Sequence, residues 1–263
     1  MDIKDKLFFH PSYMEGVSER RIFLFAHAGA GASFYMRWKK FFDRKTAVYP
    51  IQLPGHENRS SEALEKDFYK LTDRIADIIS DYTDMPYAFF GHSLGASVCF
   101  ETAVKLQKKG MNIPQSIFLS ANRPPVIKPD YSFIYSIDDD EFCSILCKNG
   151  AFHGDMLSDK DFRAAFLPVI RADFELYASY DASQERYSVD SDIYALCGDN
   201  DPFASKEHML LWKGYTKGSF SLVQYSGAHF YINDNIKDIC GRISSSITKD
   251  TKAQEDAVGE LTK

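Results

Sequence analysis

The chain of 263 residues is 44% hydrophobic and carries a formal net charge of -6 at pH 7. Such a chain is long enough to bury one large core, so we expect residues 1–263 to form a single α/β domain. The negative charge and the lack of a long arginine- and lysine-rich stripe argue against nucleic acid as a partner, because a phosphate backbone requires clustered basic side chains.

Six short runs rich in β-branched and aromatic residues predict strands along the chain. Several runs are apolar on both faces, which is typical of a parallel sheet covered by helices on both sides. Segments with helical spacing lie between them, including residues 61–81 and the stretch from Ser93 to Gly110. This alternation predicts a doubly wound, mostly parallel sheet flanked by helices. The predicted strands are residues 22–25, 47–53, 87–90, 116–121, 192–197 and 220–225.

An insertion is predicted between the fourth and fifth strands, because about 70 residues separate them and a strand–helix unit needs roughly 30. We expect residues 124–188 to form a mobile helical lid over the functional site, with a second small domain as the alternative. The polar segment 244–263 is expected to be a flexible tail. The segment DKDFRAAFLPVIRADFELYASY in this insertion is predicted to be helical. One face of that helix would be lined by Phe162, Phe166, Ile170 and either Phe174 or Tyr177.

The motif GHSLGA places Ser93 where the third predicted strand turns into a helix. Glycines two positions before and after it, Gly91 and Gly95, allow a tight turn that raises the serine hydroxyl above the sheet. The first amides of the following helix point at the same place, so the N–H of Leu94 could stabilise an oxyanion. The pattern predicts a nucleophile elbow, although a glycine-rich loop with a chance serine would share the bare motif.

A serine hydroxyl needs a base and an orienting carboxylate to act as a nucleophile near neutral pH. The segment CGDNDPF after the fifth predicted strand offers Asp201, which we prefer because its spacing from the glycine reaches past the strand end; Asp199 is the alternative. His229 follows the last predicted strand, where an α/β-hydrolase places its base. We therefore expect Ser93, Asp201 and His229 to form a catalytic triad.

The segment AHAGAGAS, residues 26–33, follows the first predicted strand, and its small residues allow close approach of the backbone. The N–H of Ala28 is the expected second donor to the oxyanion, beside that of Leu94. A phosphate-binding loop is the competing interpretation, but the segment has neither a Gly-Lys-Ser/Thr ending nor the G-x-G-x-x-G spacing. No cofactor site is predicted.

The five cysteines are expected to be reduced thiols in a cytoplasmic protein, and Cys143 with Cys147 lacks the further ligands of a metal site. The first residues do not have the pattern of a secretory signal. No apolar stretch reaches the roughly 20 residues needed to cross a bilayer, so no membrane partner is expected.

Six motifs in order make the chain resemble the type II thioesterases that accompany nonribosomal peptide and polyketide synthases. The resemblance covers about residues 20–240 and is carried by FAHAGAGASFYMRW, IQLPGHENR, FFGHSLGA, LPVIRADFELYASY, CGDNDPF and GAHFYI. It implies an α/β-hydrolase fold and hydrolysis of acyl or aminoacyl thioesters from phosphopantetheinylated acyl or peptidyl carrier proteins. The chain departs from the family at Ala26, where proline is usual, and at His56, where arginine is usual.

The resemblance also implies roles for the site residues. Ser93 would be acylated, and His229 would take and return the proton. Asp201 would orient His229, while the amides of Leu94 and Ala28 would hold the oxyanion. The protein would act in trans as a monomer, without a metal or cofactor. The alternatives are a carboxylester hydrolase or lipase acting on free small esters, and a catalytically silent carrier-binding protein.

Overall fold

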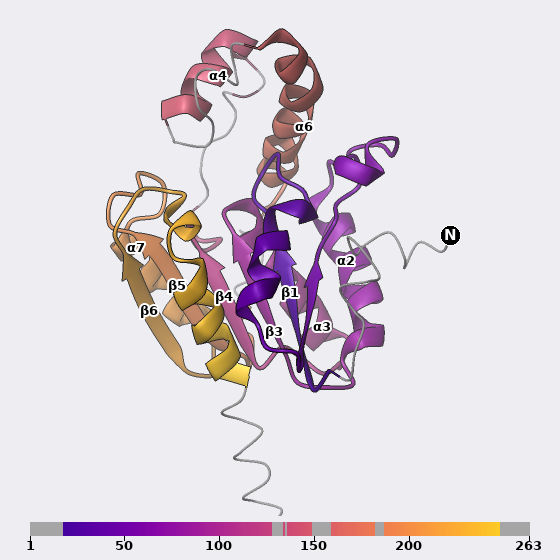
Figure 1. The fold of residues 1–263 in the computed structure, drawn as a ribbon, viewed down its shortest axis with the longest axis vertical. Coiled ribbons are helices and arrows are strands. Elements are labelled where there is room, and N and C mark those ends of the chain that lie inside the picture. Colours follow the sequence, from indigo (N-terminus) through magenta and orange to yellow (C-terminus); the bar gives the residue numbers. More distant parts are fainter. Residues whose placement is uncertain (1–17, 128–133, 135, 149–158, 182–186, 248–263) are drawn as a thin grey trace, which may run out of the picture.

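A six-stranded sheet with all strands parallel forms the centre of the computed structural model (Figure 1). The strand order is β2-β1-β3-β4-β5-β6, so all six predicted strands and the predicted fold class are confirmed. The structure describes residues 18–127, 134, 136–148, 159–181 and 187–247. The strands are β1 (Arg20–Phe25), β2 (Thr46–Pro50), β3 (Tyr87–His92), β4 (Ser116–Ser120), β5 (Asp192–Gly198) and β6 (Phe220–Tyr225).

Helices cover both faces of this sheet. Alternate strand residues point to opposite faces: Phe23 and Phe89 enter one core with α2 and α3, whereas Ile22 and Phe90 enter another with η2 and the last helix. Burial on both faces explains why these strands are continuously apolar. The α-helices are α2 (Phe68–Ile79), α3 (Leu94–Lys108), α4 (Asp139–Lys148), α6 (Lys160–Ala178), α7 (Lys206–Leu210) and residues 236–247. The 3-10 helices are η2 (Ala32–Phe41), η3 (Glu57–Arg59), η4 (Ser80–Tyr82), η6 (Leu211–Tyr215) and η7 (Tyr231–Asn233).

The helix predicted over residues 61–81 is shorter than expected. It begins at Phe68, because the side chain of Asp67 accepts a hydrogen bond from the Lys70 amide at 3.0 Å and caps the first turn. The helix behind Ser93 ends as predicted, with Gly110 just beyond it at φ +65°. A side-chain cap rather than hydrophobic spacing therefore decides where α2 starts.

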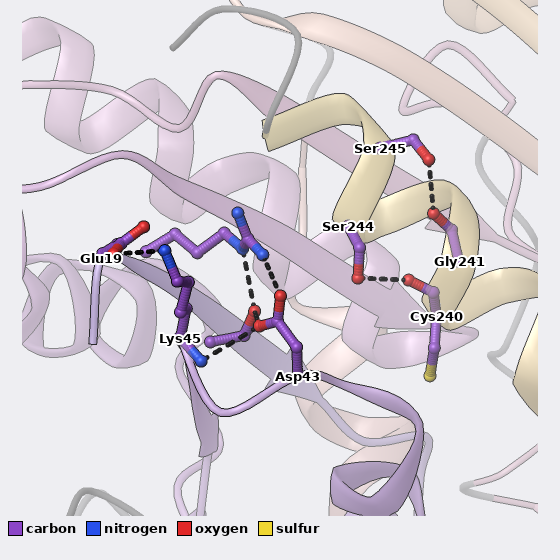
Figure 2. Close-up of polar contacts among 9 residues, drawn as sticks. Glu19, Asp43, Lys45, Cys240, Gly241, Ser244 and Ser245 are labelled. Carbon is purple, nitrogen blue, oxygen red and sulfur yellow. Dashed lines mark hydrogen bonds and ion pairs between the residues drawn. The ribbon is translucent and has the colours of Figure 1, made fainter. Parts of the chain in front are cut away.

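The last helix, residues 236–247, continues past Ser244, where the flexible tail was predicted to begin. Ile247 is fully buried against the sheet. Figure 2 shows the Ser244 hydroxyl donating to the Cys240 carbonyl, one turn earlier, at 2.9 Å. The expected tail is therefore corrected at residues 244–247, which are helical; residues 248–263 lie outside the described residues.

Within the predicted insertion 124–188, helices α4 and α6 lie at one end of the sheet, away from the two layers on its faces (Figure 1). They share a small core of their own that includes Leu167 and Ile170. Phe166 is 44% exposed and stacks on Phe162 with ring centroids 4.4 Å apart, whereas Ile170 on the same predicted face is buried. Apolar residues occur around most of α6, and their spacing alone could not determine which of them are buried.

All five cysteines are free thiols, as expected, and four of them are buried. Burial raises the pKa of Cys197 to about 11 and that of Cys240 to about 12, which keeps both protonated and unreactive near neutral pH. No helix in the described ranges is both long enough and apolar enough to cross a membrane.

Candidate active site

The loops that follow β1 and β3 meet at the carboxyl end of the sheet. Strand β1 pairs with β2 on one side and with β3 on the other, so the strand order reverses at this point. Such a reversal opens a crevice outside the strand ends, because the two connections leave in opposite directions. Ala28 follows β1 and Ser93 follows β3, and the topology therefore brings both residues to the same place.

Ser93 has a strained backbone, with φ 54° and ψ -123°. A positive φ costs a residue with a side chain on the order of 1–3 kcal/mol and persists only where its surroundings hold it. The Ser93 amide donates to the Ser120 carbonyl at 2.8 Å, and the Asn122 side chain donates to the Ser93 carbonyl at 2.7 Å. The sharp turn predicted from GHSLGA is thus present, with Ser93 at the head of α3.

Both glycines of the motif are required by backbone contacts. A Cβ atom on Gly91 would lie 2.2 Å from the carbonyl oxygen of Gly95, and one on Gly95 would lie 2.2 Å from that of Phe25. These distances are far inside van der Waals contact, and the atoms that would clash belong to the main chain. The turn therefore excludes every side chain at these two positions.

The substitution Gly95→Ala is expected to lower the free energy of unfolding by about 1–3 kcal/mol, because β1 and α3 must separate to admit a methyl group. Urea denaturation monitored by circular dichroism measures the change. The matched control is Gly241→Ala in the last helix, where a Cβ would meet nothing within 4 Å. There alanine should stabilise by roughly 0.5–1 kcal/mol through its helix propensity. Equal midpoints for the two variants would contradict the packing argument.

His229 and Asp201 form a hydrogen-bonded pair, with Nδ1 of the ring 2.9 Å from Oδ2 of the carboxylate. The Asp201 side chain is fully buried, and its other oxygen accepts from the amides of Phe203 at 2.9 Å and Ala204 at 3.3 Å. The carboxylate is held from both sides, so it fixes the ring and leaves Nε2 available for proton transfer. The His229 ring lies 5.1 Å, between centroids, from that of His92, the neighbour of Ser93.

Asp199, the alternative acid, has different partners. Its Oδ1 accepts from the Gly227 amide at 2.8 Å and from the Asn200 side chain at 2.8 Å, and the residue is exposed. It ties the end of β5 to the loop that precedes His229. The geometry favours Asp201 as the carboxylate that orients the histidine.

The two predicted oxyanion donors are both available. Leu94 is the first residue of α3, so its N–H has no helical carbonyl to bond. Within the described part of the chain, neither this N–H nor that of Ala28 donates to a protein acceptor. The amides that follow Ala28 are occupied: Gly29 donates to Asp173 at 2.7 Å and Ala30 to the His27 carbonyl at 3.1 Å.

Two more histidines adjoin the pair. Burial, opposed by the hydrogen bond to the Ala28 carbonyl, lowers the pKa of His27 to about 4. Burial also holds the pKa of His92 well below its usual value, and repulsion by His229 acts in the same direction. Both rings are therefore neutral near pH 7.

Two supporting groups around the site were not predicted. Asn122, which holds the Ser93 carbonyl, accepts a hydrogen bond from the Tyr177 hydroxyl of α6 at 2.8 Å. His56 and Asp173 form a buried pair with 2.9 Å between Nε2 and Oδ2. An aspartate within the apolar pattern of α6 was the available signal, since a buried carboxylate requires a partner.

Comparison with known proteins agrees with this geometry. Residues 20–247 match the family model described as a thioesterase domain. Thioesterase PikA5 of Streptomyces venezuelae is 30% identical over 240 residues, which cover 91% of this chain and 84% of that protein. Gramicidin S biosynthesis protein GrsT of Aneurinibacillus migulanus is 31% identical over 225 residues, covering 84% and 86%.

A solved structure extends the agreement to three dimensions. The type II thioesterase BorB from the borrelidin biosynthetic cluster is 26% identical, covers 90% of this chain and 94% of its own, and has a TM-score of 0.79. The resemblance to type II thioesterases that the six motifs indicate is thus confirmed, as is the prediction of an enzyme. The chain belongs to the thioesterase domain family.

Proposed function

We propose that this protein hydrolyses acyl and aminoacyl thioesters on the phosphopantetheine arm of carrier proteins and so clears blocked or wrongly primed peptide and polyketide synthases. The observation that carries the proposal is the buried Asp201–His229 pair next to the elbow at Ser93. The named relatives support the substrate class, because GrsT is a gramicidin S biosynthesis protein and BorB comes from the borrelidin cluster.

In the proposed acylation step, Ser93 Oγ attacks the thioester carbonyl while His229 Nε2 takes the hydroxyl proton. The bond between carbon and sulfur then breaks, the acyl group stays on Ser93, and His229 gives the proton to the leaving sulfur, which becomes the free thiol of the carrier arm. Asp201 keeps the ring in place and stabilises its positive charge. The amides of Ala28 and Leu94 donate to the oxyanion of the tetrahedral intermediate.

Deacylation repeats the same proton transfers with water as the nucleophile. His229 takes a proton from water, the hydroxide adds to the acyl carbon, and the proton returns to Ser93 Oγ as the free acid leaves. The chain's own groups are sufficient for both steps. We propose that the enzyme works as a cytoplasmic monomer in trans to the synthase.

We further propose that the insertion over residues 124–188 covers the acyl site as a lid. Its helix α6 lies at the same end of the sheet as the elbow (Figure 1). Ile170 of this helix packs closely on Gly29: a Cβ atom added to Gly29 would lie 2.4 Å from Cγ1 of Ile170. Together with the hydrogen bond from Tyr177 to Asn122, which holds the Ser93 carbonyl, this contact joins the insertion to the loop after β1 and to the support of the elbow.

The substrate class is tested by comparing one acyl group on three donors: a carrier protein, pantetheine and p-nitrophenol. We expect kcat/KM for a hexanoyl carrier protein to exceed that for hexanoyl pantetheine and for the p-nitrophenyl ester by about tenfold or more, because contacts with the remote carrier contribute to transition-state binding. Acid release measured by mass spectrometry gives all three values. Acetyl and aminoacyl carriers extend the series.

Other outcomes would favour the rival functions. Equal kcat/KM for the carrier thioester and the free ester would identify a carboxylester hydrolase. Binding of the acyl carrier without any release of acid would identify a catalytically silent carrier-binding protein. Hexanoyl pantetheine is a thioester without a carrier protein, so its kcat/KM separates a preference for thioesters from recognition of the carrier surface.

A further inference from the structure

A buried carboxylate on α6 holds the loop that carries the proposed oxyanion donor Ala28. Asp173 is 3% exposed, and its Oδ2 accepts two hydrogen bonds, from the Gly29 amide at 2.7 Å and from His56 Nε2 at 2.9 Å. His56 is also 3% exposed and lies after β2. One oxygen atom thus joins three segments that are far apart in the sequence.

The partners of His56 make it a charged residue. Its Nδ1 lies 3.0 Å from the Pro54 carbonyl while its Nε2 faces Asp173, so both ring nitrogens face acceptors. Only a protonated imidazole can donate to both. Burial by itself would lower the pKa of His56, but the hydrogen bond and charge of Asp173, with the Pro54 carbonyl and the Glu57 carboxylate, raise it. Asp173 therefore faces a buried positive charge.

The Asp173 contact controls the peptide unit next to the donor. In the unit between Ala28 and Gly29, the carbonyl lies 3.0 Å from His27 Nδ1 and the N–H donates to Asp173. In the preceding unit, which bears the Ala28 N–H, the His27 carbonyl accepts from Ala30. Because each peptide unit is planar, holding its carbonyl also sets the direction of its N–H.

Gly29 is the weak point of this loop. It has φ +76°, and without a side chain it can rotate to other conformations at little cost. The other side chains that hold the loop act further along: Gln52 accepts from the Ala32 amide at 2.8 Å, and Glu57 accepts from the Ser33 amide at 3.2 Å. Among the described residues, Asp173 supplies the side-chain acceptor at Gly29 itself.

We propose that Asp173, held by the imidazolium of His56, is a positioning residue that directs the Ala28 N–H toward the oxyanion. Because Asp173 lies on α6, this direction depends on the position of that helix. The inference rests on the proposed function, since it requires Ala28 to act as a donor during acyl transfer. A pair that only anchored α6 would affect folding or substrate binding but leave the chemical step unchanged. The distinction is measurable.

The test uses the full chain with Asp173→Asn and His56→Gln. Both variants keep hydrogen-bonding groups but remove the charge pairing, and we expect kcat to fall about 10- to 100-fold with KM within about threefold of the wild type. A second readout is the affinity for a hexanoyl trifluoromethyl ketone. Ser93 Oγ adds to the carbonyl carbon of this ketone, and the carbonyl oxygen becomes an alkoxide at the place where the oxyanion forms. Its affinity should fall by a factor similar to that of kcat.

A rescue and a control accompany these variants. In His56→Arg the positive charge persists at high pH, so kcat should stay within about threefold of the wild type at pH 7 and decline less than the wild type by pH 9. The charged groups that face position 56 are Asp173 and Glu57. The control is Asp139→Asn, because Asp139 pairs with Arg171 of α6 at 2.9 Å but does not contact the loop. Its kcat should not change.

The outcomes separate this inference from the proposed function. If Ser93→Ala is inactive while Asp173→Asn and His56→Gln retain the wild-type kcat, the positioning role is wrong and the function stands. If the wild type releases no acid from the hexanoyl carrier, the proposed function itself is wrong. A rise in KM alone, or an equal loss of kcat in Asp139→Asn, would also overturn the positioning role. Should Asp173→Asn fail to fold, His56→Gln and His56→Arg decide the question.

Discussion

Replacement of Ser93 by alanine is expected to lower kcat for acid release from an acyl carrier by about 10⁴-fold or more, because no other group in the proposed mechanism can form the acyl-enzyme. Alanine tolerates the positive φ about as poorly as serine, so the elbow and the fold should persist. Mass spectrometry of the carrier measures release. Circular dichroism and binding of the acyl carrier confirm that the variant is folded.

The matched control for this experiment is Ser245→Ala. Ser245 is exposed on the last helix, and its hydroxyl donates to the Gly241 carbonyl of the same helix at 2.9 Å (Figure 2). Its removal should leave kcat and KM unchanged. An acylated Ser93, trapped on the wild type by rapid quenching and located by peptide mapping, would support the mechanism. Undiminished release by Ser93→Ala would show that another residue is the nucleophile.

The substitution Asp201→Asn is expected to lower kcat by about 10⁴-fold, as is typical when an amide replaces the carboxylate that orients a catalytic histidine. The amide cannot stabilise the imidazolium, and it can hold His229 in the wrong tautomer. Nearby Asp199→Asn provides a matched comparison, because its Oδ1 can still accept from the Gly227 amide. We expect its kcat to stay within about threefold of the wild type.

Steady-state kinetics on one hexanoyl carrier decides between the two aspartates. A large loss of kcat in Asp199→Asn, with Asp201→Asn nearly unaffected, would reverse the assignment of the acid. Similar losses in both variants, accompanied by lowered melting temperatures, would indicate that the loop after β5 depends on both carboxylates for its structure. Melting curves are therefore measured beside the rates.

Local patterns were sufficient to predict the sheet and the position of the elbow. Strands such as β3 and β4 are continuously apolar because both faces are buried, and this property is visible in any short window of sequence. Gly91 and Gly95 reveal the sharp turn through their spacing around Ser93. At Gly91 the side chain is excluded by the backbone of the turn itself, whereas at Gly95 it is excluded by the Phe25 carbonyl of β1. The order of Ser93, Asp201 and His229 relative to the strands followed from these elements.

Contacts between distant segments could not be predicted in the same way. The start of α2 depends on the Asp67 cap, and the buried face of α6 depends on how the insertion packs rather than on its apolar spacing. The choice between Asp199 and Asp201 required the position of the His229 ring, which comes from another loop.

The sequence by itself determined the fold class, the strand order along the chain, the elbow and the family, because each depends on residue types at short spacing. Only the tertiary structure decided how the insertion meets the site. Asp173 lies 117 positions from His56 and 144 from Gly29, yet one of its oxygen atoms binds both. A buried charge needs a partner, but no local pattern in the sequence says which distant residue supplies it.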